Sequence, residues 1–145
     1  DAGGIVLVVG APGADEYRDQ FNAWADQWEQ VARQSDVPCK TIGREDDDEL
    51  NDRQRLEKVI QSVKPEGSSP LWVVLIGHGT FARNVAKFNL NGPDVSATQL
   101  AQWLAPVKRP VVVVNCASAS GPFVNRLSGP NRIVVTSTKS GVEQN

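Results

Sequence analysis

Several residue types are scarce in this sequence, and each shortage excludes a class of function. The 145 residues include one histidine, two cysteines and no methionine. Two cysteines do not make a disulfide framework, and one histidine with scattered carboxylates gives no metal-ligand spacing, so we expect no metal site. The formal net charge of -2 provides no basic surface, so we expect no nucleic-acid partner.

Long apolar runs are also missing. No run approaches the ~20 residues that span a bilayer, so the sequence predicts no membrane span. The length suits a single domain over residues 1–145. Because the chain lacks an initiating methionine and ends directly after a strand-like segment, we expect it to be truncated or processed at its C-terminal end.

Apolar spacing predicts strands that alternate with helices. The expected strands are residues 5–9, 39–42, 71–76, 111–114 and 133–135; the expected helices are residues 15–33, 50–63, 123–127 and one that begins at a Ser96/Gln99 capping box. A surface excursion at residues 80–92 is expected to form a hairpin around Asn91-Gly92. The alternation predicts an α/β fold: a three-layer sandwich whose mostly parallel central sheet has helices on both faces.

The first expected helix carries large apolar residues at intervals of three and four. They are Tyr17, Phe21, Trp24, Trp28 and Val31. This spacing is typical of one face of an amphipathic helix, and we interpret the whole set as core.

Two chemically reactive residues follow strand-like segments. The only histidine, His78, comes directly after 71–77, and Cys116 follows 111–115. If the two strands are neighbours in a parallel sheet, their carboxyl ends lie ~4.8 Å apart, and His78 can act as general base for a Cys116 nucleophile. Small residues surround both, so the amides of Gly79 and Cys116 are predicted to form an oxyanion hole. Cys39 has no such setting and is interpreted as structural.

The two blocks 73–79 (Val-Val-Leu-Ile-Gly-His-Gly) and 111–116 (Val-Val-Val-Val-Asn-Cys) resemble those of the caspase/legumain-type cysteine peptidase superfamily. Further similarity to a bacterial-style legumain-like domain lies in residues 5–38, in Ser120-Gly121 and in the stretch 136–143. The resemblance covers nearly the whole chain.

This resemblance implies a caspase-like α/β fold and a cysteine endopeptidase that cleaves a peptide or protein substrate through a Cys116/His78 dyad, without a cofactor. It implies cleavage after Asn or Asp, with Arg18 in the specificity pocket and the segment that holds Ser140 and Glu143 as another wall. It also implies association with a missing C-terminal segment, and it favours export to the periplasm or extracellular space over the cytoplasm.

The sequence departs from the legumain pattern at Asp19, Val114 and Asn115. Val114 replaces a polar residue of the pocket, which supports an alternative: a catalytically silent caspase-like binding or assembly module. A transpeptidase or ligase that uses the same dyad is a second alternative. A flavodoxin-like nucleotide site at the loop 10–13 is a third, although this loop matches neither phosphate-binding fingerprint.

Overall fold

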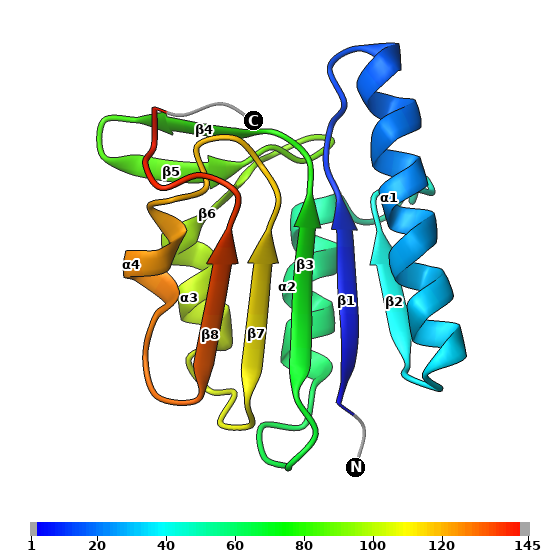
Figure 1. The fold of residues 1–145 in the computed structure, drawn as a ribbon, viewed down its shortest axis with the longest axis vertical. Helices are drawn as coiled ribbons and strands as arrows, with labels where there is room; N and C mark the ends of the chain where they lie inside the picture. Colours follow the sequence, from blue (N-terminus) through cyan, green and yellow to red (C-terminus); the bar gives the residue numbers. More distant parts are fainter. Residues whose placement is uncertain (1–2, 143–145) are drawn as a thin grey trace.

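A sheet of five parallel strands forms the centre of the molecule. The computed structural model describes residues 3–142, and in it the strands are β1 (Gly4–Val9), β2 (Cys39–Ile42), β3 (Leu71–Ile76), β7 (Val111–Asn115) and β8 (Arg132–Thr136). Their order across the sheet is β2-β1-β3-β7-β8 (Figure 1). β1 and β3 are almost fully buried, which fits their continuous apolar sequences. The predicted α/β class and mostly parallel sheet are confirmed.

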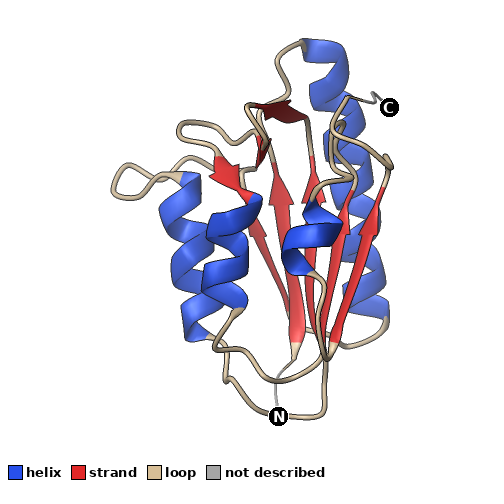
Figure 2. Ribbon diagram, turned by 90° about the vertical axis from the view of Figure 1, so that its left-hand side faces the viewer, coloured by secondary structure: helices blue, strands red, loops and turns tan. Residues whose placement is uncertain are grey.

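Helices lie against both faces of this sheet (Figure 2). α1 (Asp15–Gln34) covers one face, and α2 (Asp52–Ser62), α3 (Ala97–Leu104) and α4 (Phe123–Leu127) cover the other. The predicted capping box opens α3, because the Ser96 hydroxyl accepts from the Gln99 amide while the Gln99 side chain accepts from the Ser96 amide.

The cover is uneven across the sheet. α1 lies over β1 and β3, where Phe21 and Ala25 pack against strand residues such as Leu7. On the edge strand β8, Ile133 and Val135 remain 61% and 51% exposed. The prediction that helices cover both faces therefore fails at β8, because one helix is too narrow to cover five strands.

The excursion after β3 is a small antiparallel sheet. β4 (Gly79–Ala82) pairs with β5 (Val85–Phe88), and β5 pairs with β6 (Val95–Ser96). The hairpin turns at Arg83 and Asn84, whose φ angles are 52° and 61°. Positive φ angles at both central residues are typical of a type I′ turn, whose twist matches the twist of the two paired strands. The predicted hairpin around Asn91-Gly92 is the second connection of this sheet, because these two residues lie in the loop between the antiparallel strands β5 and β6. The Arg83-Asn84 turn was not predicted, because Arg-Asn is a weak local turn signal and this turn depends on the pairing of its strands.

α1 is longer than the strands that it covers. Its 20 residues extend ~30 Å at 1.5 Å each, whereas the 6 residues of β1 extend ~20 Å. The chain enters α1 from the carboxyl end of β1, so the excess length stands above that edge of the sheet (Figure 1). The first two turns of α1 therefore form a wall beside the strand ends.

No helix within residues 3–142 has both the length and the apolar character to cross a bilayer.

Arg109 closes the opposite end of the sheet. Its side chain is 1% exposed, and its guanidinium donates hydrogen bonds to the carbonyl oxygens of Lys64, Glu66 and Ser69 at 2.9, 2.7 and 3.1 Å. These bonds tie the loop before β3 to the segment that leads into β7.

Arg109→Met should lower the free energy of unfolding by about 2–3 kcal/mol, because three charge-assisted hydrogen bonds are lost at a buried position. Urea unfolding followed by circular dichroism measures this change. Arg126→Met, at an exposed position of α4, is the matched control and should change stability by less than about 0.5 kcal/mol. Equal stability of the two variants would contradict the role given to Arg109.

Candidate functional site

His78 and Cys116 lie at the same edge of the sheet, on adjacent strands. β3 pairs directly with β7, and the last pair in register is Leu75 with Asn115. Cys116 is thus the first residue after β7, and His78 is two residues beyond β3. The predicted adjacency of these strands is confirmed. Both residues line one cleft of about 440 Å³.

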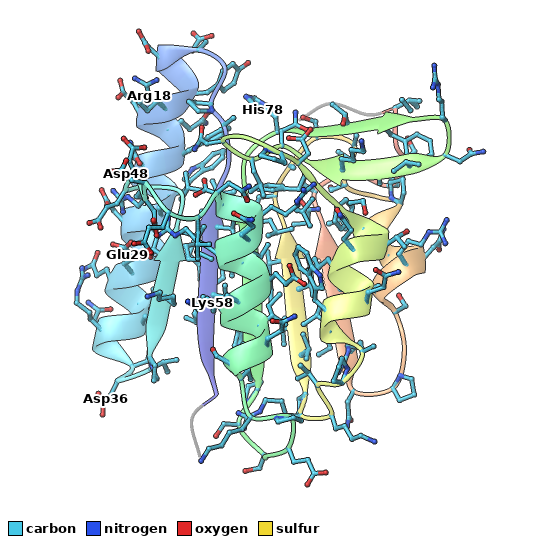
Figure 3. The ribbon with its side chains drawn as sticks, turned by 180° about the vertical axis from the view of Figure 1, so that it is seen from behind. Arg18, Glu29, Asp36, Asp48, Lys58 and His78 are labelled. Carbon is cyan, nitrogen blue, oxygen red and sulfur yellow. The ribbon has the colours of Figure 1, made fainter. Side chains whose placement is uncertain are left out.

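The His78 ring is held from two sides. Its Nε2 lies 3.0 Å from the carbonyl oxygen of Pro12. A carbonyl oxygen only accepts, so Nε2 carries a proton and Nδ1 is the atom that can accept one. The ring also makes edge contacts with Tyr17 and Phe21, with centroids 4.7 and 5.1 Å away and interplanar angles of 84° and 62°. Contacts with Pro12, Tyr17 and Phe21 therefore fix the orientation of the imidazole. Figure 3 shows His78 near the first turns of α1.

The Cys116 thiol is partly buried, and this burial raises its pKa above the ordinary value. The resting side chain is thus a neutral thiol at neutral pH. Neither Cys116 nor Cys39 forms a disulfide.

Hydrogen bonding within the sheet occupies one of the two predicted oxyanion donors. The amide of Cys116 donates to the carbonyl oxygen of Leu75 at 2.9 Å, so it continues the β3–β7 ladder and is already engaged. This corrects the expectation that the Cys116 amide serves as an oxyanion donor. The parallel pairing of β3 with β7 includes Asn115, one residue beyond the predicted strand 111–114.

The amide of Gly79 keeps its predicted position. Asn89 donates to the His78 carbonyl at 2.9 Å, and alternation along the antiparallel ladder then places the Gly79/Phe88 pair between hydrogen-bonded pairs. The Gly79 N–H consequently faces away from β5. A Cβ atom at this position would meet the Ser118 carbonyl oxygen at 2.2 Å, so only glycine lets the two strand-end loops approach this closely.

A hydroxyl network holds the loop that follows Cys116. The Ser137 hydroxyl donates to the Ala117 carbonyl at 2.8 Å, and the Thr138 hydroxyl accepts from the Gly121 amide at 3.1 Å. The buried Ser120 hydroxyl lies 3.4 Å from that of Thr138. The segment after β8 thereby fixes the segment after the cysteine.

Two of the predicted specificity residues, Arg18 and Ser140, lie outside the cleft. Arg18 is exposed, pairs with Asp15 at 3.4 Å, and lines a separate hollow of about 170 Å³ together with Pro12 and Arg44 (Figure 3). Ser140 accepts hydrogen bonds within the segment 138–142 and does not line the cleft. Glu143 lies outside the described residues. The sequence could not predict this, because the carboxyl edge of the sheet carries more than one hollow, and strand order alone does not show which residues line which hollow.

Sequence reasoning missed the wall of the cleft. Besides His78, Cys116, Gly77 and Gly79, the described residues that line the cleft are Tyr17, Gln20, Phe21, Trp24 and Ser118. The interpretation of the large apolar residues of α1 as core was wrong for Tyr17, Trp24 and Val31, which are 40%, 38% and 52% exposed. The length of α1 relative to β1 was the signal that could have revealed that its first turns rise above the sheet.

Comparison with known proteins gives no assignment: no family model matches the chain, and no curated protein matches it. Within residues 3–142, no group of three or more His, Cys, Asp or Glu side chains is arranged to hold a metal ion.

Because burial raises the Cys116 pKa, alkylation of Cys116 by iodoacetamide should be slow at pH 6–7. The rate should increase up to about 10-fold per pH unit and level off only above the ordinary thiol range near 8.5, since the thiolate is the reacting form. Peptide mapping after timed labelling measures this profile at each cysteine. A rate that is already maximal at pH 6 would mean a preformed thiolate and would contradict this account.

Thr138→Val keeps the shape of the side chain but removes the hydroxyl that accepts from Gly121. We expect a loss of about 1–3 kcal/mol in the free energy of unfolding, because the Gly121 amide is left buried without its acceptor. Thr98→Val on the exposed surface of α3 is the matched control. Urea unfolding compares the two, and a loss no larger than that of the control would refute the network.

Proposed function

We propose that this protein is a cysteine endopeptidase in which Cys116 attacks the peptide carbonyl and His78 transfers the proton. One observation carries the proposal: the only histidine of the chain and Cys116 line the same cleft, on adjacent strand ends. The bond to Pro12 adds support, because it leaves His78 Nδ1 as the proton acceptor.

The resting thiol makes His78 a general base. As the Cys116 sulfur forms a bond to the substrate carbonyl carbon, its proton passes to the imidazole. The imidazolium then gives that proton to the leaving amine as the peptide C–N bond breaks. Water, deprotonated by the same imidazole, hydrolyses the thioester and returns Cys116 to the thiol.

The carbonyl oxygen becomes negative in this step and needs donors. The Gly79 N–H is the first candidate, because it faces away from the β4–β5 ladder. The side chains of Gln20 and Ser118 also line the cleft and carry N–H and O–H groups. These groups take the role that the engaged Cys116 amide does not fill.

The resemblance to the caspase/legumain superfamily is part of this proposal. Its support is that the two similar blocks fall on β3 and β7, whose ends meet at the cleft. Cleavage after Asn or Asp has less support, because Arg18, the residue that the resemblance assigns to specificity, does not line the cleft. A ligase or transpeptidase would pass through the same thioester and differ only in the acceptor amine.

A catalytically silent binding module is the second candidate. Two observations favour it: the Cys116 amide is already hydrogen-bonded, and burial raises the pKa of the Cys116 thiol. A thiol is a weaker nucleophile than the thiolate of a preformed thiolate–imidazolium pair. Val114 does not support it, since this side chain packs beneath α1 and does not line the cleft.

Cys116→Ala and His78→Ala should each lower kcat/KM for peptide hydrolysis by about 10³-fold or more while the fold is retained, since each removes one partner of the proton transfer. Mass spectrometry of a peptide mixture after incubation measures the products, and circular dichroism checks the fold. Cys39→Ala is the matched control and should keep full activity. Undiminished hydrolysis by the Cys116→Ala protein would refute the dyad.

A further inference from the structure

Three aromatic rings from the first turns of α1 form a continuous row along the cleft. The Tyr17 and Phe21 centroids are 6.0 Å apart, and those of Phe21 and Trp24 are 6.1 Å apart. Phe21 is buried, whereas Tyr17 and Trp24 stay partly exposed on either side of it. The spacing of four and three residues places all three on one face of the helix. We call Tyr17, Phe21 and Trp24 the aromatic wall.

The wall borders the reacting atoms. Tyr17 and Phe21 both contact the His78 ring, and all three aromatic residues line the same cleft as Cys116. Single exposed hydrophobic residues are ordinary on protein surfaces. Contiguous rings beside a nucleophile are different, because aromatic surface left in contact with water gains free energy when an apolar group covers it.

The charges in the cleft point to the same kind of ligand. Among residues 3–142, none of those that line the cleft is an Asp, Glu, Lys or Arg. Arg18 lies on the same helix but lines the other hollow, and its guanidinium pairs with Asp15. An acidic or basic side chain in the cleft would lose hydration without gaining an ion pair, which disfavours it.

The size of the cleft fits one large side chain with its main chain. A volume of about 440 Å³ is within the range of specific small-ligand sites. Gly77 and Gly79 line it as well, and a glycine contributes only main-chain atoms, which a peptide backbone can contact. A substrate can thus present its main chain to the glycines and a side chain to the aromatic wall.

We infer that the aromatic wall is the specificity subsite of this protein, and that it takes a large apolar or aromatic side chain adjacent to the scissile bond. The inference rests on the proposed peptidase function and names its substrate class: peptides with Phe, Tyr, Trp, Leu or Met beside the cleaved bond. Trp24 is the residue that tests it best, because Tyr17 and Phe21 also contact His78.

The first experiment measures hydrolysis of a peptide library and then of matched peptides that carry Phe, Ala, Asp or Lys at the selected position. Wild-type protein should select the apolar and aromatic residues, and Trp24→Ala should lower the Phe-over-Ala ratio of kcat/KM by at least about 10-fold. Val31→Ala changes an exposed apolar residue of the same helix away from the cleft, and it should leave the ratio unchanged. Selection of Asp, Asn, Lys or Arg, or an unchanged ratio in Trp24→Ala, would overturn the subsite.

The second experiment does not depend on catalysis. Cys116→Ala protein is titrated by calorimetry or NMR with hexapeptides that have Phe or Asp at the centre, and the Phe peptide should bind at least about 10-fold more tightly, with the difference lost when Trp24→Ala is added. Such selective binding without hydrolysis by wild-type protein would mean that the subsite is correct and the peptidase proposal is not. Equal binding of the two peptides would overturn the subsite itself.

Discussion

The parallel pairing of β3 with β7 is the constraint on which the candidate site depends. It brings two strand ends within ~4.8 Å of each other, and the register Leu75 to Asn115 fixes the order in which the chain leaves the sheet. Since a shift of one residue would turn every side chain of β7 to the other face, the buried valines Val111 and Val113 hold this register. The core therefore positions the main chain of His78, Gly79 and Cys116 at the edge of the sheet.

The second determinant is that one helix serves two environments. The lower turns of α1 bury Ala25 and Ala32 against the sheet, while its upper turns present Tyr17 and Trp24 to the cleft. The same hydrophobic stripe continues through both parts, so the core that anchors α1 also fixes the aromatic wall relative to His78. The Pro12 carbonyl, in the loop between β1 and α1, also holds the imidazole through Nε2.

Much of the fold was predictable because local patterns and tertiary structure agree. Continuous β-branched runs became the central strands, and the Ser96/Gln99 capping box opened α3. The placement of His78 and Cys116 at one edge of the sheet was also predictable, since the strands that precede them pair. The Arg83-Asn84 turn, the engaged amide of Cys116 and the location of Arg18 were not, because each depends on contacts between segments that are distant in the sequence. Periodicity identified the apolar face of α1, but it did not show which residues of that face extend beyond the ends of the strands.

The central claim is that Cys116 and His78 act together in one cleft, and covalent trapping tests it most directly. A peptidyl acyloxymethyl ketone with Phe next to the reactive group would be incubated with the folded protein at pH 7, followed by peptide mapping of Cys39 and Cys116. The account predicts modification of Cys116 alone, at a rate that falls by at least about 100-fold in His78→Ala. Equal modification of both cysteines, or a rate that is unaffected by His78→Ala, would contradict it.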